Sequence, residues 1–361
     1  MGLKERVDAA IDAALGERVV GCVVLINEGG RPVYVRAAGY ADREAGRTVR
    51  ENSIFRLASV TKPIVATTAL RMIDLGLLRL DDPVTKYLPW FTPRAPDGTS
   101  PDILIRHLLT HTSGLTYDRP PDVSSGADPG PLIPLEENLK RYVRQPLAFA
   151  PGTAWHYGMS IDVLGGVLAA INRSDLEGAV AKYVTGPLGM THTHFGVSEG
   201  PRLAVPYGDG KPTPFRMAEP QAMPNDDGSF DHYSPKRIFQ HDAPQSGGSG
   251  MAGPAGDLMK MLEAVRGDFL APATRDAALA NQIADLPRDD AGQRFGYLGA
   301  VIADPKVSGW PAAGMVQWGG IWGNSWILDP VRNICVVAYT NTMREGCNGP
   351  FRAEIRDAVY G

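Results

Sequence analysis

The sequence predicts an α+β protein, a sandwich-type fold in which helices flank an antiparallel sheet and a helical domain is inserted into the chain. Strand-like runs rich in Val, Ile and Tyr gather near the two ends, at residues 19–42 and 295–341. Short helical patterns and loops dense in Pro and Gly fill the middle of the chain. We therefore expect a sheet domain made of residues 1–78 and 250–361, with an inserted helical domain at residues 79–249.

The first elements follow from apolar spacing. Near the N-terminus, apolar residues recur at helical spacing between charges at Asp8 and Asp12, which predicts an amphipathic helix over residues 3–15. Two strand-like runs then surround the turn "NEGGRP", which is the pattern of an antiparallel hairpin. The next helix opens at Ser59 and stops at Gly76. Its apolar residues lie on nearly all sides, so we expect it to be buried.

The later elements are shorter. The middle of the chain predicts helices at "IRHLLTH", "EENLKRYVRQ" and "DVLGGVLAAI". Residues 196–248 show little periodicity and many breakers, which is typical of a long wrapping loop or a lid. Beyond residue 250, "DLMKMLEAVRG" predicts a short helix and "PFRAEIRDAVYG" a closing amphipathic helix. Four strand-like runs lie between these helices: "FGYLGAVIAD", "GMVQWGG", "NSWILDP" and "NICVVAYTN".

Composition and charge exclude several classes of partner. The 361 residues are 43% hydrophobic and carry a formal net charge of −4, from 36 basic and 40 acidic residues without a long run of either sign. This even distribution argues against a nucleic acid or an anionic membrane surface as the main partner. No stretch is apolar for long enough to cross a bilayer, and the N-terminus lacks the features of a secretory signal. We therefore expect a soluble, cytoplasmic protein.

The three cysteines form neither a CxxC pair nor an even disulfide set. Cys22 and Cys335 lie in apolar strand-like runs, where a cysteine behaves as a small buried hydrophobic residue. Cys347, in "REGCNGP", is expected to be an exposed loop thiol. We assign a catalytic role to none of them.

The stretch "RLASVTKPIV" carries the first chemical signal. Ser59 and Lys62 are three residues apart, so at a helix start their hydroxyl and amine lie on the same face. A serine hydroxyl needs an adjacent base, and a lysine can be that base when burial and the helix dipole disfavour its ammonium form. Pro63 suits the first turn of a helix, which fixes the helix start near Ser59. The alternative is that Ser59 caps the helix and Lys62 is an ordinary solvated side chain.

Two further stretches contain groups that could complete a catalytic site. In "FAPGTAWHYGMSIDVLGGVL", the phenol of Tyr157 could relay a proton, and the alternative is a core aromatic residue. In "QWGGIWGNSW", the paired Gly319 and Gly320 allow a ligand to approach the backbone closely. The amides of Ile321 and Ser59 are the candidate oxyanion donors. The alternative for this stretch is a turn at the end of a strand.

Taken in this order, "SVTK", "WHYGMSIDVLGG" and "WGG" resemble the three motifs of the serine β-lactamase and penicillin-binding-protein superfamily. The resemblance is greatest to its family VIII carboxylesterase branch, which is similar to class C β-lactamases. It covers roughly residues 20–341. The segments that carry it are "IFRLASVTKP", "LDDPVTKYLPWF", "IRHLLTHTSGL", "APGTAWHYGMSIDVLGG", "GPLGMTHTHF", "GGSGMAGPAGDLMKM" and "WGGIWGNSWILDP".

The resemblance implies a β-lactamase- or transpeptidase-like fold, with the active site in the cleft between the sheet domain and the helical domain. It implies that Ser59 is acylated, that Lys62 is its base and that Tyr157 assists proton transfer. The third motif supplies the oxyanion amide of Ile321. No metal or other cofactor is needed. The residues expected to contact the substrate are Trp318, Gly319, Gly320, Trp322 and His156.

Two departures from penicillin-processing relatives bear on the substrate. Those relatives usually have Tyr-x-Asn in the second motif, where this chain has Met159 two residues after Tyr157. Their third motif usually starts with Lys or His, where this chain has Trp318. A cation there helps to bind the carboxylate of a penicillin or a peptide terminus, so its absence favours a neutral ester. The WGG form is itself typical of family VIII esterases.

The sequence thus predicts a serine hydrolase that cleaves small carboxylic esters with short acyl chains through an acyl-enzyme. A β-lactamase, a D-amino-acid amidase or peptidase, and an acyltransferase are alternatives on the same site. A penicillin-sensing or scaffold protein, and a binding protein without chemistry, are the alternatives from other classes. The expected partner is a small-molecule ester, with no nucleic acid and no membrane, and the oligomeric state is open.

Weaker patterns compete with this interpretation. "GSGMAG" has the GxGxxG spacing of a dinucleotide site, but no strand precedes it. His192 and His194 form an HxH pair without a further ligand cluster, so we predict no metal site. The chain has no complete GxSxG nucleophile elbow. His111 and His156 are expected to be mainly structural, although His156 adjoins Tyr157 and could tune it.

Overall fold

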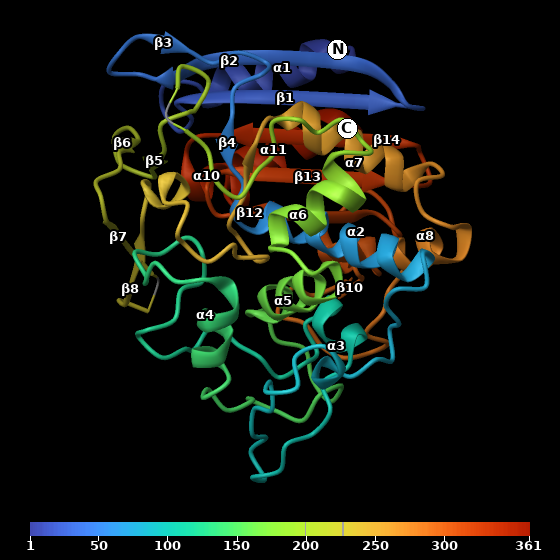
Figure 1. The fold of residues 1–361 in the computed structure, drawn as a ribbon. Coiled ribbons are helices and arrows are strands. Elements are labelled where there is room, and N and C mark those ends of the chain that lie inside the picture. Colours follow the sequence, from blue (N-terminus) through green and yellow to red (C-terminus); the bar gives the residue numbers. More distant parts are fainter. Residues whose placement is uncertain (199, 226) are drawn as a thin grey trace.

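Both ends of the chain build one eight-stranded antiparallel sheet in the computed structural model, which describes residues 1–198, 200–225 and 227–361 (Figure 1). The strand order is β10-β11-β12-β13-β14-β1-β2-β3, so the pairing of β14 with β1 joins the two chain ends. The strands are β1 (Gly21–Glu28), β2 (Arg31–Asp42), β3 (Arg47–Thr48), β10 (Gln293–Phe295), β11 (Ala300–Ile302), β12 (Val316–Gly320), β13 (Asn324–Asp329) and β14 (Ile334–Thr340).

Strand β1 lies inside the sheet, and its sequence reflects this position. Val24 pairs with Ala338 of β14 on one side and with Arg36 of β2 on the other. All of its residues except the last, Glu28, are buried, because helices cover both faces of the sheet. A strand that is buried on both faces is apolar throughout instead of alternating, which explains the run "GCVVLIN".

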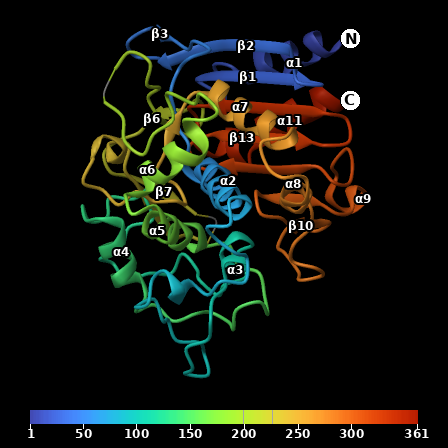
Figure 2. The same cartoon turned by 45° about the vertical axis from the view of Figure 1, so that its right-hand side comes forward.

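Two helical layers enclose the sheet (Figure 2). Val336 of β14 belongs to the core under α1 and α11, whereas Val337 belongs to the core under α2 and α7. Successive strand residues point to opposite faces, so the two layers lie on opposite sides of the sheet. The layer helices are α1 (Leu3–Ala14), α11 (Pro350–Tyr360), α2 (Thr61–Asp74) and α7 (Ala255–Arg266).

The middle of the chain forms a mainly helical region below α2 in Figure 1. Helix α5 is its centre and contacts α2, α3, α4 and α6. Within residues 196–248, strand β5 pairs with β6 and strand β7 pairs with β8. The helices of this region are α3 (Ile105–Leu109), α4 (Leu135–Tyr142), α5 (Ser160–Asn172) and α6 (Leu176–Val180), which continues into a π-helical turn at Ala181–Thr185.

The remaining elements are short. They are β4 (Phe55–Arg56), β5 (Tyr207–Gly208), β6 (Phe215–Arg216), β7 (Gln221–Pro224), β8 (Phe230–Tyr233), β9 (Ala252–Gly253), α8 (Pro272–Leu279), α9 (Pro305–Ser308) and α10 (Met343–Cys347). The predicted fold class is confirmed, because an antiparallel sheet from both chain ends is flanked by helices. The division into two domains at residues 78 and 250 stays a prediction, as does a lid at residues 196–248.

Two element boundaries differ from the prediction. The run "FGYLGAVIAD" contains a hairpin instead of one strand, because a tight turn from Gly296 to Gly299 separates β10 from β11. The Gly296 amide donates to the Gly299 carbonyl at 2.8 Å. Helix α2 begins at Thr61 instead of Ser59, because residues Ala58–Val60 first form a 3-10 turn. This turn places Ser59 directly before the N-terminus of α2.

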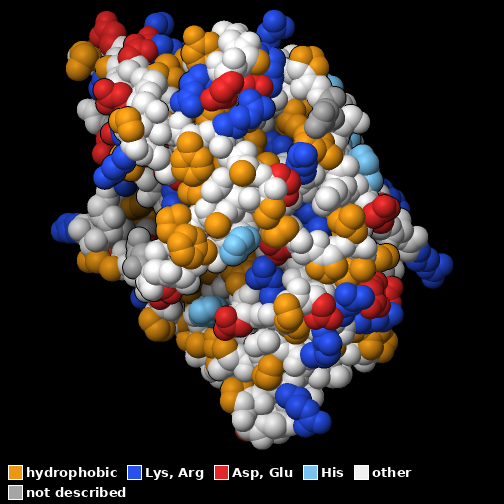
Figure 3. Space-filling view, turned by 90° about the vertical axis from the view of Figure 1, so that its left-hand side faces the viewer, with side chains coloured by type: hydrophobic (Ala, Val, Ile, Leu, Met, Phe, Trp, Pro, Cys, Tyr) orange, Lys and Arg blue, Asp and Glu red, His pale blue; other side chains and the backbone are white. Residues whose placement is uncertain are grey.

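Acidic and basic side chains are interspersed on the face shown in Figure 3, in line with their even spread along the sequence. This is the side of the molecule that carries the hairpins β5–β6 and β7–β8 in Figure 1. Within the described ranges, no helix combines the length and the apolar character that crossing a membrane requires.

Candidate active site

Ser59 lies in a strained turn between β4 and α2. The preceding residue, Ala58, has φ +43°, a left-handed conformation that alanine rarely adopts. Two hydrogen bonds from distant segments hold the turn. The Leu57 amide donates to Met251 O at 2.8 Å, and Asn324 Nδ2 donates to the carbonyl at the end of β4 at 2.6 Å. Such strain persists only where the surrounding structure enforces it, and it is common at functional sites.

The Ser59 hydroxyl contacts two groups that can exchange a proton with it. Tyr157 OH lies 2.7 Å from Ser59 Oγ, and Lys62 Nζ lies 3.1 Å from it. Lys62 is only 4% exposed, so it is not the solvated side chain of the alternative interpretation. Nor does a side chain cap α2, since no cap hydrogen bond is formed there. The structure thus brings the three predicted catalytic residues together.

Lys62 has three hydrogen-bond partners, which match the three N–H groups of an ammonium. Besides Ser59 Oγ, its Nζ lies 3.0 Å from Tyr117 OH and 2.7 Å from Gly248 O. No local pattern in the sequence points to Tyr117 or Gly248, because both reach Lys62 from distant segments. Burial holds the pKa of Tyr117 well above its usual range, so this phenol stays protonated at neutral pH.

Aromatic rings surround Tyr157 and fix its position. The ring centroids of His111, Trp318 and Tyr117 lie 4.7, 5.1 and 5.5 Å from that of Tyr157, and Trp155 stacks on it at 6.5 Å. Trp318 Nε1 also donates to Tyr157 OH at 3.2 Å. Burial, together with the nearby charge of Lys62, keeps the pKa of His111 well below its usual value. His111 is therefore a neutral packing residue at physiological pH.

The predicted oxyanion donors are both free to bind a ligand. Neither the Ser59 amide nor the Ile321 amide donates a hydrogen bond to any described residue. Gly320 lets the end of β12 approach the Ser59 turn, since a Cβ there would lie 2.1 Å from Leu57 O and 3.3 Å from the Ser59 nitrogen. Two free amides beside a nucleophile are what an oxyanion hole requires. Gly320 thus acts through backbone spacing and, unlike the prediction, does not line the cavity.

Two cavities meet at Ser59, and Ser59, Tyr157 and Ile321 line both of them. We name them the α11 arm and the β8 arm. The α11 arm has about 470 Å³, and its further lining includes Trp310, Gln317, Trp318, Gly319, Cys347, Arg352 and Arg356. The β8 arm has about 280 Å³, and its further lining includes Tyr117, Arg119, Asp128, Asp231, His232 and Tyr233. An ester whose carbonyl reaches Ser59 can place one side in each arm.

The α11 arm contains two arginines, which corrects the inference that the site lacks a cation. Arg352 Nη1 donates to Cys347 O at 3.1 Å and Nη2 contacts Gln317. Its buried Nε has no hydrogen-bond partner among the described residues, and it forms no ion pair with any of them. The third motif has Trp318 in place of a cation, but the C-terminal helix supplies one to the same cavity. A preference for neutral esters therefore no longer follows from the motif.

Two predicted substrate contacts lie away from the cavity. Trp322 is 5% exposed and packs with Ala58 and Met343 behind the Ser59 turn, because its indole completes a small apolar cluster there. His156 is exposed and lines neither arm, and its amide donates to the His111 carbonyl at 3.0 Å. Trp318 and Gly319, in contrast, do line the α11 arm.

Cys347 is not the exposed loop thiol that we expected. It ends helix α10, is half-buried and lines the α11 arm beside Gly319. Burial raises the pKa of Cys347 to about 11, so the thiol stays protonated at neutral pH. A protonated thiol is a weak nucleophile, which agrees with our assigning it no catalytic role.

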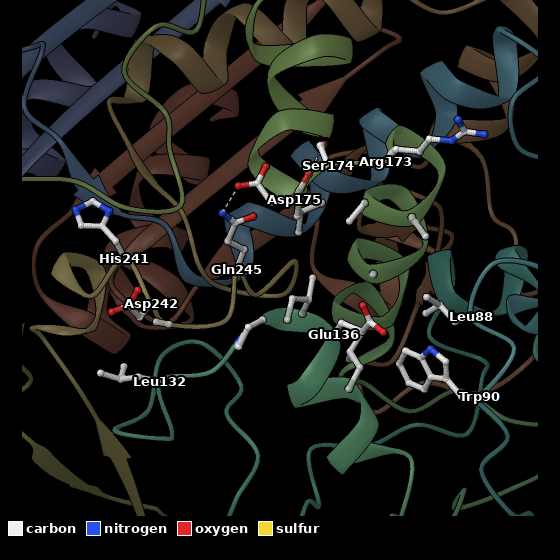
Figure 4. Close-up of a pocket in the computed structure, with 18 residues that line it drawn as sticks. Leu88, Trp90, Leu132, Glu136, Arg173, Ser174, Asp175, His241, Asp242 and Gln245 are labelled. Atoms are coloured by element: carbon white, nitrogen blue, oxygen red, sulfur yellow. Dashed lines mark hydrogen bonds between the residues drawn. The ribbon is translucent and has the colours of Figure 1, made fainter.

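A larger cavity, of about 540 Å³, lies between α4, α5 and the segment before Ser246 (Figure 4). Its walls are mostly apolar, with Leu88 and Trp90 at one side. Polar groups lie around it, among them Asp175, which accepts a hydrogen bond from Gln245 at 3.0 Å. Neither Ser59, Lys62 nor Tyr157 reaches this cavity. Chemistry, and not volume, therefore identifies the candidate active site.

The two competing motifs have structural explanations. His194 Nδ1 lies 2.9 Å from Glu177 Oε1. Across the described ranges, no group of three or more His, Cys, Asp or Glu side chains is arranged to hold a metal ion. In "GSGMAG", Gly248 packs against α5, where a Cβ would lie 2.4 Å from Asp162 Oδ2. The glycines of this motif therefore permit close packing.

The fold and the site together define a class of protein. A helix-flanked antiparallel sheet, and a serine that contacts a buried lysine and a tyrosine beside two free amides, are the features of the serine β-lactamase and penicillin-binding-protein class. A family model described as Beta-lactamase matches residues 7–359, and the chain belongs to this family.

Relatives and solved structures agree with this assignment. The chain is 45% identical to Esterase EstB of Burkholderia gladioli over 375 aligned residues, which cover 99% of this chain and 95% of that protein. Among solved structures, EstCE1, described as a hydrolase with promiscuous acyltransferase activity, matches with a TM-score of 0.93 and 38% identity, covering 99% of this chain and 98% of that one. Unliganded simvastatin synthase from Aspergillus terreus has the same fold, with a TM-score of 0.75 at 22% identity over 100% of this chain and 98% of that one.

Proposed function

We propose that this chain is a carboxylesterase that cleaves small esters through an acyl-enzyme on Ser59. The observation that carries the proposal is the position of Ser59 Oγ, 3.1 Å from Lys62 Nζ and 2.7 Å from Tyr157 OH, where two cavities meet. The 45% identity to Esterase EstB supports the reaction class independently.

In the acylation step, Ser59 Oγ attacks the ester carbonyl carbon and its proton passes to the neutral amine of Lys62. The amides of Ser59 and Ile321 stabilise the negative charge that develops on the carbonyl oxygen. The bond between the carbonyl carbon and the alcohol oxygen then breaks. Tyr157 donates its phenolic proton to the leaving alkoxide, which departs as an alcohol. The proton that Lys62 took from Ser59 then passes to the Tyr157 oxygen.

In the deacylation step, water takes the place of the alcohol and attacks the Ser59 ester. The same groups remove a proton from the water and return one to Ser59 Oγ, and a carboxylic acid leaves. Tyr117 contributes a protonated phenol beside Lys62 Nζ, at 3.0 Å, and so helps to hold the amine in place. No cofactor takes part in either step.

We propose substrates with short acyl chains, because aromatic rings narrow the cavity around Ser59. Trp318 and Tyr157 line the α11 arm, and Tyr117 and Tyr233 line the β8 arm. Arg352 adds a second feature, since its guanidinium lines the α11 arm without an ion pair to a described residue and suits an ester that also carries a carboxylate. A p-nitrophenyl ester series from acetate to decanoate tests the chain-length proposal, and a maximum at long chains would contradict it.

Acyl transfer to an alcohol is the second candidate function, and the two arms favour it. After acylation one arm holds the acyl group, while the other is open to water or to an acceptor alcohol. EstCE1, which is 38% identical, is described as having this activity as well as hydrolysis. The ratio of transfer to hydrolysis in the presence of an added alcohol measures this function.

The first experiment compares p-nitrophenyl acetate, p-nitrophenyl butyrate and nitrocefin for the wild type and Ser59→Ala. We expect ester turnover that Ser59→Ala abolishes, with little nitrocefin cleavage. Ser174→Ala is the matched control, because Ser174 lines the larger cavity of Figure 4, and it should leave turnover unchanged. Faster turnover of nitrocefin than of the esters would favour a β-lactamase, and unchanged ester turnover in Ser59→Ala would refute the mechanism.

A further inference from the structure

A buried carboxylate that the mechanism does not use lies behind the candidate active site. Asp162, in the first turn of α5, is 1% exposed. Its Oδ1 accepts hydrogen bonds from the Ser246 hydroxyl and from the Gly248 amide, the latter at 3.3 Å. Its Oδ2 has no hydrogen-bond partner, and Asp162 forms no ion pair, among the described residues. A buried carboxylate without an ion pair is costly, so its presence needs an explanation.

The turn that Asp162 holds is packed against α5 without spare room. A Cβ at Gly248 would lie 2.4 Å from Asp162 Oδ2, and a Cβ at Gly247 would lie 2.4 Å from Ile161 O. Ser246 is buried as well. Asp162 thus fixes both the position and the orientation of the Gly248 peptide.

The Gly248 carbonyl in turn fixes Lys62, because it lies 2.7 Å from Lys62 Nζ. A carbonyl can only accept, so this contact uses one Lys62 N–H group in either protonation state. In the neutral amine, the lone pair is then directed to one of the other two partners, Ser59 Oγ at 3.1 Å or Tyr117 OH at 3.0 Å. This is the geometry that a base for Ser59 requires.

The charged and titratable groups around this pair are few. Burial holds the pKa of Asp162 above its usual value, and the charge of Lys62 and the hydrogen bonds from Ser246 and Gly248 offset part of this effect. The phenols of Tyr117 and Tyr142 face Asp162, and burial together with its charge raises their pKa values. Tyr157 and His111 complete the surroundings of Lys62, and His111 is neutral.

We propose that Asp162 is a positioning residue for Lys62: it orients the amine through the Gly248 carbonyl and places a carboxylate behind it. The proposal rests on the proposed function, in which Lys62 is the base for Ser59. Asp162 touches neither cavity and therefore acts on the substrate only through Lys62.

Asp162→Asn tests the charge, because asparagine keeps an acceptor at this position and removes only the ionised form. We expect the acid limb of the kcat/KM profile for p-nitrophenyl acetate to move to lower pH by about one unit, the usual size of a neighbouring-charge effect. Loss of a nearby negative charge disfavours a cationic form of the site, which sets the direction. The KM should change less than twofold, since Asp162 lines neither arm.

Gly248→Ala tests the position. The added methyl group would lie 2.4 Å from Asp162 Oδ2, so the Gly248 peptide or the Asp162 side chain has to shift, which disturbs the contact of the Gly248 carbonyl with Lys62. We expect the rate of Ser59 acylation, followed as the p-nitrophenol burst, to fall at least about tenfold at every pH, with no shift of the acid limb. If the acid limb of the kcat/KM profile moves in Asp162→Asn but not in Gly248→Ala, the effect of the Asp162 charge is distinguished from the effect of the Gly248 position.

Asp257→Asn is the matched control. Asp257 is 3% exposed, lies in the first turn of α7, and accepts from the Thr193 hydroxyl at 3.0 Å and the His192 amide at 3.1 Å. It resembles Asp162 in burial and helix position but is ion-paired with Lys260 at 2.9 Å and does not contact Lys62, so the pH profile of Asp257→Asn should match the wild type. A thermal melt of each variant reports loss of folding separately.

An unshifted acid limb in a folded Asp162→Asn would overturn the proposal and leave Asp162 a purely structural residue. The same shift in Asp257→Asn would overturn it as well. Failure of the proposed function gives a different result. Ester turnover would then survive in Ser59→Ala, regardless of the pH profile of Asp162→Asn.

Discussion

Both arms of the cavity at Ser59 contain arginine, but Arg119 of the β8 arm and Arg352 of the α11 arm differ in their partners. In the β8 arm, Arg119 Nη2 lies 2.6 Å from Asp128 Oδ2, and its Nε and Nη1 donate to backbone carbonyls at 3.1 Å. In the α11 arm, Arg352 has no acidic partner among the described residues, and its buried Nε is unpaired. Arg119 is therefore a structural residue, whereas Arg352 brings to its arm a positive charge that no ion pair neutralises.

The difference shows how one nucleophile can serve two chemically distinct spaces. Ser59, Tyr157 and Ile321 belong to both arms, so changes to them should affect every ester. Residues of one arm should affect only those esters that use it. The predictions below test this division, beginning with the shared residues.

The largest effect is expected for Tyr157→Phe, which removes the phenol shared by both arms. Because the phenol contacts Ser59 Oγ at 2.7 Å, kcat should fall about 10²–10⁴-fold for neutral and anionic esters alike, with KM nearly unchanged. Steady-state kinetics on p-nitrophenyl acetate and on a carboxylate-bearing analogue measure it. Trp155→Phe is the control, because it keeps an aromatic ring against Tyr157 and leaves the Tyr157 phenol in place. It should lower kcat much less than Tyr157→Phe does.

Gly320→Ala should disturb the place where the two arms meet, at the Ser59 turn and the Ile321 amide. A Cβ at Gly320 would lie 2.1 Å from Leu57 O, so the strand end must move and the Ile321 amide moves with it. We expect kcat for all esters to fall about 10²–10³-fold, as in the loss of one oxyanion donor. Circular dichroism and a thermal melt show whether the fold is kept. A fully active, folded Gly320→Ala would contradict the assignment of the Ile321 amide.

Arg352→Gln should sharpen the difference between the arms. For an ester that carries a carboxylate, KM should rise about tenfold, which corresponds to about 1.4 kcal/mol, because the unpaired cation is lost. For a neutral ester of the same size KM should stay within about twofold. Arg119→Gln is the matched variant in the other arm, and it should not discriminate between the two esters. Equal effects of Arg352→Gln on both esters would show that this arginine only supports the structure.

The smallest effect concerns stability and pH. Below about pH 6.5 the unfolded state binds a proton at His111 that the folded state does not, because burial depresses the pKa of this residue. Stability should therefore fall as the pH falls, by up to about 1.4 kcal/mol per pH unit from this group. His111→Asn should weaken that dependence, and asparagine tolerates the φ of +57° found there. Denaturant unfolding at pH 7.5 and 5.5 measures the change in the free energy of unfolding between the two pH values. If His111 had its ordinary pKa, this change would be the same in the wild type and in His111→Asn.

Much of this protein was open to prediction from local sequence. Apolar spacing predicted helix α1 and the β1–β2 hairpin, because the periods of a helix and a strand depend only on neighbouring residues. The contact between Ser59 and Lys62 is also local, since three residues of helix bring them to one face. Tyr157 and Ile321 were candidates from the chemistry of their own stretches, and the family resemblance joined them to Ser59, which local spacing does not do.

The tertiary structure alone decided the surroundings of these residues. Gly248 reaches Lys62 from 186 residues away and Tyr117 from 55, and Arg352 enters the cavity from the last helix. The sequence pattern suggested an exposed Cys347 and a cavity without a cation, and it placed Trp322 and His156 at the substrate. The structure instead half-buries Cys347, brings arginines to the cavity, and places Trp322 and His156 outside its lining, because burial and the direction of a side chain depend on how distant segments pack. Local spacing determines which groups share a helix face, whereas only the folded chain determines which groups from other elements meet them.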